Sequence, residues 1–265
     1  MSVIAMNKRI RHVRESRVCF QSRIAMAIFL LCCGCLLAGQ VLAGEQTAGG
    51  EHQIQLTLNQ LLGPQQAARY RDIIPADEVL GWELYLPDND LSERPGVFVY
   101  VSPRNSGKID PRWRAVMDQQ NLVYIAARDS GNRKPVNRRM VLAIMAIRAL
   151  ARKIPFASDR IIVSGFSGGG RVASMLASQY PGAFSGALYI CGVNPFKKKT
   201  TDVERLAQNR FVFLSGTRDF NLADTRRVYH QYLATGAQSK LMVVRDMTHE
   251  LPDTKVLTEA LEFLQ

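Results

Sequence analysis

The sequence predicts a single α/β domain built on a doubly wound, mostly parallel sheet, behind an N-terminal targeting segment. Three observations lead to this fold class. Several short apolar runs are nearly continuous, which is typical of strands covered on both faces. Stretches with helical spacing alternate with these runs, and the connections between them are short. Apolar side chains make up 47% of the 265 residues, enough to fill a sizeable core.

Residues 1–43 are expected to form a secretory signal peptide that is cut after Ala43. Six basic residues precede an uncharged apolar run from Ile24 to Ala43, and the run ends in small residues. Because this run is long enough to span a bilayer, an uncleaved anchor is the alternative. Cys35 is a further candidate, as a lipidation site. We expect a periplasmic or extracellular protein that meets a membrane only if it is anchored or lipidated.

The charges and cysteines that follow this segment exclude several classes of protein. The segment holds six of the 34 basic residues and one of the 23 acidic residues, which leaves a net charge of +6. No aromatic residues interleave the densest basic run, Lys197–Lys199, so no nucleic-acid partner is expected. Cys191 is the one cysteine after Ala43, which excludes an intramolecular disulfide and a thiolate metal site. We predict no metal and no cofactor.

The strands are expected in order along the rest of the chain. Residues 44–80 are less regular and are assigned to a strap or a leading strand, with the main domain at 81–265. Alternating residues at 82–86, closed by a proline, predict an outer strand of the sheet. Buried strands are expected at 96–102, 122–127, 160–164, 186–191, 211–215 and 241–244.

Helices are expected between these strands. Their predicted ranges are 111–120, 138–153, 169–179, 224–235 and 256–263. The third carries one apolar stripe and ends before Pro181, and the fourth stops at Gly236, a residue that favours helix ends. Strands and helices that alternate in this way form a doubly wound sheet in one domain.

One strand-to-helix turn, Gly165-Phe166-Ser167-Gly168-Gly169, carries the pattern G-x-S-x-G. A serine in such a turn adopts strained backbone angles, and the flanking glycines relieve the resulting contacts. Its hydroxyl is then exposed at the positive end of the next helix, and the Gly168 amide faces any oxyanion formed there. A phosphate-binding loop would need Lys and Ser or Thr where Arg171 and Val172 stand. A structural turn with an idle serine is the remaining alternative.

A nucleophilic serine needs a histidine to accept its proton and a carboxylate to orient that histidine. Asp219 and His249 each lie just after a predicted strand, in the order expected of partners to Ser167. The carboxyl ends of parallel strands meet at one edge of a sheet, so these residues can converge there. His52 precedes the main domain and His230 lies on the polar face of a helix, which makes both poor candidates.

Asp246 is a second candidate for the acid, because it lies only three residues before His249. We favour Asp219, since the loop of a neighbouring strand approaches the imidazole nitrogen that is remote from the serine. Asp246 stands at the end of the histidine's own strand, where it is better placed to cap the turn backbone.

These motifs resemble those of the α/β-hydrolase superfamily, and most of all the esterase and polyhydroxybutyrate-depolymerase-like branch. The resemblance rests on the Gly165–Gly169 turn, the Arg218-Asp219 loop and the His249 loop, and it covers about residues 80–265. It implies a serine esterase that acts through an acyl-enzyme, with Ser167 as nucleophile, His249 as base and Asp219 as acid, and the N-terminal segment adds the expectation that this esterase is exported. Gly168 would supply one oxyanion amide.

The loop after the third strand departs from this family pattern. Many members carry His-Gly there, at the second oxyanion donor, whereas this chain has Ser102-Pro103-Arg104-Asn105. Proline has no N–H, so the donor is expected to be Arg104, with Asn105 as the alternative. A non-catalytic binding or scaffold protein on the same fold, which has lost turnover through this loop, is the competing hypothesis.

Only 18 residues, Gly192 to Asn209, lie between two of the predicted strands at the point where many hydrolases insert a helical cap. A large cap does not fit there, and an open site suits bulky or polymer-borne esters. The expected partner is a small-molecule or polymer-borne ester. Xylan-bound acyl groups, feruloyl esters and polyesters all agree with this expectation. An amide substrate is less expected, although the same residues serve both reactions.

Overall fold

The computed structural model describes residues 49–88 and 93–265. The expected signal peptide, with its cleavage point at Ala43 and the candidate lipidation site Cys35, lies outside the described residues. Within the described ranges, no helix combines the length and the apolar character needed to cross a bilayer.

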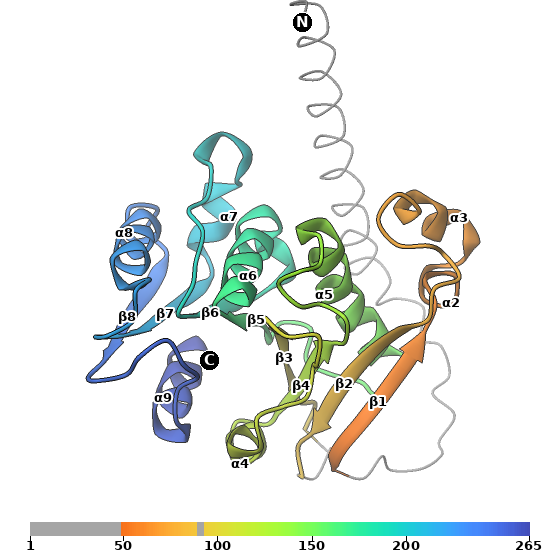
Figure 1. The fold of residues 1–265 in the computed structure, drawn as a ribbon, viewed down its shortest axis with the longest axis horizontal. Helices are drawn as coiled ribbons and strands as arrows, with labels where there is room; N and C mark the ends of the chain where they lie inside the picture. Colours follow the sequence, from red (N-terminus) through yellow and green to blue (C-terminus); the bar gives the residue numbers. More distant parts are fainter. Residues whose placement is uncertain (1–48, 89–92) are drawn as a thin grey trace, which may run out of the picture. The chain divides into compact units, whose positions relative to one another are not determined.

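One eight-stranded sheet organises the described chain (Figure 1). Its strands are β1 (Gly50–Leu56), β2 (Leu80–Leu86), β3 (Gly96–Val101), β4 (Leu122–Ala127), β5 (Ile161–Phe166), β6 (Gly186–Ile190), β7 (Arg210–Gly216) and β8 (Gln238–Val244). They are ordered β1-β2-β4-β3-β5-β6-β7-β8. Strands β3 to β8 are parallel, whereas β2 runs antiparallel to both of its neighbours. The predicted fold class is therefore confirmed, and the six parallel strands end at one edge.

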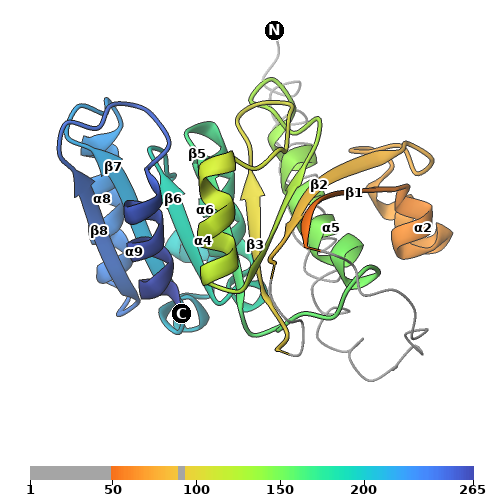
Figure 2. The same cartoon turned by 90° about the horizontal axis from the view of Figure 1, so that it is seen from below.

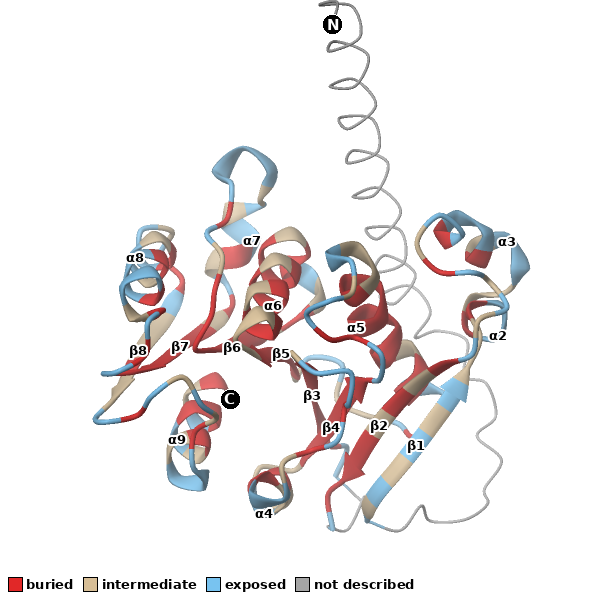
Figure 3. Ribbon diagram, in the orientation of Figure 1, coloured by how far each residue is buried: buried red, intermediate tan, exposed pale blue. Residues whose placement is uncertain are grey.

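The strand expected at 82–86 is not an outer strand, which corrects the sequence interpretation. As β2 it pairs with β1 on one side and with β4 on the other. Residues 50–56 form the edge instead, and their exposure alternates along the strand (Figure 3). Trp82 of β2 is fully buried and its indole donates to Leu142 O at 3.1 Å, because helix α5 (Val136–Ala151) covers that face.

The remaining helices cover both faces of the sheet. They are α2 (Leu58–Leu62), α3 (Pro64–Ala67), α4 (Arg114–Gln119), α6 (Gly168–Gln179), α7 (Val203–Ala207), α8 (Leu222–Leu233) and α9 (Thr254–Leu264). Helices α4 and α9 lie on one face, and α5, α6 and α8 lie on the other (Figures 1 and 2). All five predicted helices are present. The three that were not predicted have only four or five residues, too few to show a periodic pattern.

Large aromatic side chains fill the core and hold the strands in place. Trp113 packs edge-on against Tyr100 with ring centroids 5.7 Å apart. Tyr189 of β6 and Tyr232 of α8 are fully buried, and their hydroxyl oxygens lie 3.2 Å apart, so that one hydroxyl donates a hydrogen bond to the other. Each such side chain stabilises the fold by about 1.5–3 kcal/mol. The loops at the carboxyl edge of the sheet therefore follow strands that are held in place by a well-packed core.

Candidate active site

Ser167 lies at the junction of β5 and α6 with φ 55° and ψ −120°, a strained conformation for a residue other than glycine. Such a conformation costs on the order of 1–3 kcal/mol and persists only where the surroundings enforce it. Here the Ser167 amide donates to Ile190 O of β6 at 2.8 Å. The side chain makes no capping bond to its own helix. Its hydroxyl is therefore free to meet a partner across the sheet edge.

The helix can begin directly against β3 because Gly169 has no side chain. A Cβ at this residue would stand 1.8 Å from Val101 O. Gly165 is equally confined, since its Cβ would lie 2.4 Å from the carbonyl carbon of Gly169. The glycines of the motif thus allow the close approach that presents the serine.

Gly169→Ala is expected to lower the free energy of unfolding by at least about 1–3 kcal/mol, because the methyl group must displace the end of β3. Urea denaturation would measure this loss. Gly182→Ala is the matched control, since its Cβ would meet nothing closer than the Arg205 side chain at 3.5 Å. Wild-type stability in Gly169→Ala would show that the turn tolerates a wider separation from β3.

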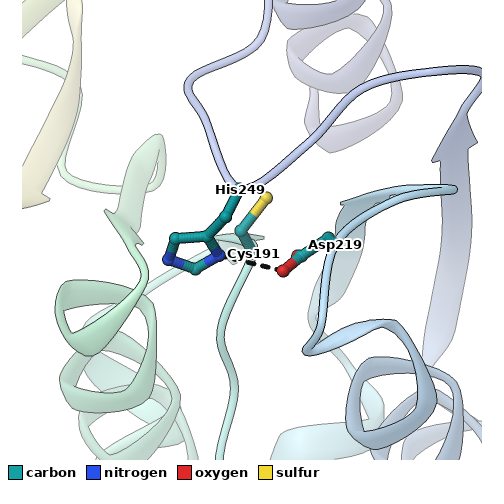
Figure 4. Close-up of side chains that lie close together, drawn as sticks. All are labelled: Cys191, Asp219 and His249. Atoms are coloured by element: carbon teal, nitrogen blue, oxygen red, sulfur yellow. Dashed lines mark hydrogen bonds and ion pairs between the residues drawn. The ribbon is translucent and has the colours of Figure 1, made fainter.

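Ser167, His249 and Asp219 form one hydrogen-bonded chain. Ser167 Oγ is 2.9 Å from His249 Nε2, and His249 Nδ1 is 2.9 Å from Asp219 Oδ1. Figure 4 shows the second of these contacts. The three side chains come from the turn after β5 and the loops after β8 and β7, all at the carboxyl edge. With its proton on Nδ1, the imidazole can accept the Ser167 hydroxyl proton at Nε2.

The Asp219 carboxylate is held in place by its own loop. Its side chain is fully buried; Oδ2 accepts a hydrogen bond from Ser215 Oγ at 2.6 Å, and Oδ1 accepts one from the Asn221 amide at 3.0 Å. Burial alone would raise its pKa, but the hydrogen bonds from Ser215, Asn221 and His249 outweigh burial and hold the pKa of Asp219 below its ordinary value. The carboxylate therefore stays ionised at neutral pH.

Asp246, the alternative acid, lies apart from this chain of contacts. Its carboxylate is 3.2 Å from Arg218, and both side chains are about two-thirds exposed. Its backbone amide donates a hydrogen bond to Thr217 Oγ1 at 2.8 Å. The structure thus places Asp219, and not Asp246, against the imidazole.

Two aromatic rings pack against the His249 imidazole, an arrangement that the sequence analysis did not predict. The Phe166 centroid lies 4.9 Å from the imidazole centroid, and the Phe220 centroid lies 4.3 Å away. Phe220 is 76% exposed, which is unusual for a large apolar side chain. Both residues adjoin motif positions, next to Ser167 and Asp219, and this adjacency is the signal that could have identified them.

Cys191 lies directly behind the acid, in a left-handed conformation with φ 52° just after β6. The donor atoms of Cys191, Asp219 and His249 all lie within 4.8 Å of one another (Figure 4). Burial, together with the Asp219 charge, raises the pKa of the thiol well above its usual range. A protonated thiol beside a carboxylate that already holds the imidazole is a poor ligand set for a metal ion. The chemistry of these donors fits a histidine–acid pair better.

Cys191→Ser is expected to change ester turnover by less than about threefold, because the thiol stays protonated and touches no reacting atom. Initial rates with a chromogenic ester would measure this. The wild-type thiol should also resist iodoacetamide in the folded protein and react after denaturation. A large rate loss in a folded Cys191→Ser protein, or rapid alkylation of the native thiol, would instead point to a thiol mechanism.

The two predicted oxyanion donors differ in the structure. Gly168 is the first residue of α6, where amide groups have no partner within the helix. The Arg104 amide, by contrast, donates to Ser102 Oγ at 3.0 Å. The Arg104 amide was predicted as the second oxyanion donor, but in this structure it is not free, because the Ser102 hydroxyl oxygen already accepts its hydrogen bond. It becomes available only if that hydrogen bond opens.

A cavity of about 520 Å³ opens beside His249. Aromatic side chains form much of its lining, namely Tyr100, Trp113, Tyr124 and Phe166. Arg104 and Lys108 stand exposed at its rim. An apolar or planar group next to the reacting carbonyl would fit a cavity of this size and lining.

A family model described as an alpha/beta hydrolase domain matches residues 115–262, more than half of the chain. The chain belongs to the α/β-hydrolase family. No curated protein matches this α/β-hydrolase.

Solved structures similar to this α/β-hydrolase include esterases and peptidases. A variant of the esterase rPPE aligns with a TM-score of 0.60 and 13% identity, over 84% of this chain and 85% of that chain. A ferulic acid esterase aligns with a TM-score of 0.57 and 13% identity, over 82% and 98%. The Porphyromonas gingivalis dipeptidyl peptidase 4 aligns with a TM-score of 0.53 and 17% identity, over 71% and 33%. The chain thus spans about a third of that peptidase, and at these identities the likeness concerns the fold.

Proposed function

We propose that this α/β-hydrolase is an exported serine esterase of the Ser-His-Asp type. The observation that carries the proposal is the unbroken hydrogen-bonded chain from Ser167 through His249 to Asp219. A strained serine, a histidine on its hydroxyl and a buried carboxylate on the far imidazole nitrogen are the parts that acyl transfer requires. The expected periplasmic or extracellular location belongs to the same proposal.

Each residue has one role in this reaction. Ser167 Oγ attacks the ester carbonyl carbon while His249 Nε2 takes its proton, and the Gly168 amide donates to the oxyanion that forms. The protonated His249 then gives its proton to the departing alcohol, which leaves an acyl group on Ser167. Water, deprotonated by His249, releases the acid and restores the serine. Asp219 orients the imidazole and stabilises its cationic form throughout.

One feature bears on which substrates can reach the site. The segment between β6 and β7 contains only a short 3-10 turn and α7, so no large cap covers the site in the described chain. The cavity beside His249 therefore remains open to small esters and to esters carried on a polymer. Because the similar structures include both esterases and peptidases, the rate of amide hydrolysis should be measured beside the rate of ester hydrolysis.

A matched pair of substrates and a serine-directed phosphonate test the proposal. We expect p-nitrophenyl butyrate to be hydrolysed, and the corresponding p-nitroanilide to be hydrolysed far more slowly. The phosphonate should abolish turnover at one equivalent, and mass spectrometry should locate its adduct on Ser167. Rapid anilide hydrolysis would assign the site to amides instead. For export, the N-terminus of protein recovered from a periplasmic fraction should be Gly44.

A non-catalytic binding protein is the second candidate, and one observation favours it. The Arg104 amide is already bonded to Ser102 Oγ, which leaves the Gly168 amide as the free oxyanion donor of the two predicted. Loss of one donor typically costs 10² to 10³ in rate. Absence of both turnover and Ser167 labelling would support this candidate.

A further inference from the structure

Arg139 is a buried cation without an acidic partner. It lies in the first turn of α5 and is 3% exposed. Its guanidinium donates three hydrogen bonds, all to backbone carbonyls: Nε to Ser130 O at 2.7 Å, Nη2 to Ser102 O at 3.1 Å and Nη1 to Gly168 O at 3.2 Å. No Asp or Glu of the described residues lies within ion-pair distance of it.

The three carbonyls belong to the segments that converge on the nucleophile. Ser102 ends β3 and begins the loop of the expected second oxyanion donor, Ser130 lies in the loop after β4, and Gly168 opens α6. The two loops are also joined to each other, since the Asn132 amide donates to Pro103 O at 2.9 Å. Helices α5 and α6 lie side by side on this face of the sheet (Figure 1). One side chain thus ties three separate stretches of chain to the site.

Three carbonyl oxygens satisfy the donors of Arg139, but no carboxylate among the described residues balances its charge. Burial lowers the pKa of this guanidinium, because a charged group out of water and without a counter-ion is destabilised. The group also contacts the first turn of α6, the positive end of that helix, where a cation is further disfavoured. A neutral amide side chain could hold carbonyls together without this penalty. An oxyanion at Ser167 would supply the missing negative charge.

Arg138, the preceding residue, shows the ordinary arrangement. Its guanidinium pairs with the Glu78 carboxylate at 3.0 Å, away from the nucleophile turn. The two arginines lie on one helical turn and differ in what they bind: a carboxylate in one case and three carbonyls of the site in the other.

We propose that Arg139 is a positioning residue of the hydrolytic reaction, which fixes the Ser102, Ser130 and Gly168 segments around the oxyanion and offsets its charge. The inference rests on the proposed function, because it assumes an oxyanion on an ester bound to Ser167. Arg139 acts through the three carbonyls and contacts no reacting atom.

The test is a kinetic comparison of Arg139→Met, Arg139→Lys and the control Arg138→Met. In Arg139→Met, kcat should fall 10²- to 10³-fold while KM changes less than about threefold, because the loss is confined to the transition state. Arg139→Lys retains the charge with fewer well-placed donors, so its kcat should be intermediate. Arg138→Met should keep kcat within about threefold, although its stability falls with the lost ion pair.

Three further readouts test whether Arg139 positions the site or has a merely structural role. Affinity for a boronic acid that forms a tetrahedral adduct with Ser167 should fall in step with kcat/KM. The pH dependence of kcat/KM should not move, since Arg139 does not contact His249. In Arg139→Ala, added guanidinium should restore part of kcat by occupying the vacated space. Loss of kcat that follows only the folded fraction, with unchanged boronic acid affinity, would overturn the inference.

The outcomes also separate this inference from the proposed function. If wild-type protein neither hydrolyses esters nor is labelled at Ser167, the proposed function fails and the inference fails with it. If wild-type protein is active and labelled but a folded Arg139→Met protein keeps its kcat, the inference alone fails. Should Arg139→Met not fold, Arg139→Lys decides by the same criteria.

Discussion

Ser167→Ala should reduce ester turnover by roughly 10⁴- to 10⁶-fold, the largest effect expected of any single change in this protein. The hydroxyl is the atom that His249 contacts at 2.9 Å, and without it no acyl-enzyme forms. Folding should be preserved, because the side chain is only partly buried and makes no bond to its own helix. The remaining rate would come from water attacking a carbonyl already polarised at the site.

Initial rates with p-nitrophenyl butyrate, together with a circular dichroism melt of each protein, would measure this effect. Ser164→Ala is the matched control. That serine lies in the same strand and donates to Leu188 O at 2.9 Å, so its loss should cost about 1 kcal/mol of stability and little activity. Turnover of Ser167→Ala within tenfold of wild type would rule out this serine as the nucleophile.

Asp219→Asn should cost about 10⁴ in kcat, and Asp246→Asn should cost tenfold at most. An asparagine at position 219 can present its amide to His249 Nδ1, which moves the imidazole proton to Nε2 and removes the acceptor that Ser167 needs. Asp246 makes solvent-exposed pairs with Arg218 and Arg245, and such pairs contribute little. Kinetics on both variants, each checked by circular dichroism, decide between the acids. An inactive, folded Asp246→Asn protein beside an active Asp219→Asn protein would reverse the assignment.

The same pair of variants should differ in how stability depends on pH. The pKa of Asp219 is lowered in the folded protein, so the unfolded chain takes up its proton first, near pH 3.9, as the solution is acidified. Its contribution to stability is present above that pH and disappears as pH falls through the lower folded value. Asp219→Asn should lack this acid-sensitive component, whereas Asp246→Asn should retain it.

Much of the fold could be predicted from the sequence, because buried strands and amphipathic helices have recognisable patterns of apolar residues. Strands β3 to β7 are buried along nearly their whole length, and their near-continuous apolar runs predicted them within a few residues. Strand β8 was predicted as a buried strand too, but it is the edge strand and is only partly buried. The position of β2 between two other strands could not be predicted, because its edge partner β1 carries alternating polar residues and was not identified as a definite strand. Strand pairing is a long-range property, and a single strand's composition does not contain it.

The candidate site was likewise predictable only in part. Ser167, Asp219 and His249 are close to strand ends, so topology alone brings them to one edge. Arg139 could not be distinguished from Arg138, since adjacent arginines in a helix usually lie on a solvated face. Likewise, Pro103 was correctly excluded as an amide donor, but the hydrogen bond from the Arg104 amide to Ser102 Oγ depends on a local turn that composition does not reveal.

The rings of Phe166 and Phe220 that pack against the imidazole have a consequence for the entropy of the reaction. A histidine held by hydrogen bonds alone can rotate about its side-chain bonds and must be brought back into line before each proton transfer. Here the flanking rings restrict such rotation. The rotational freedom of His249 is lost once, when the chain folds, and so it adds to the cost of folding and not to the activation barrier. A reactive orientation that the resting protein already holds does not have to be found again at each turnover.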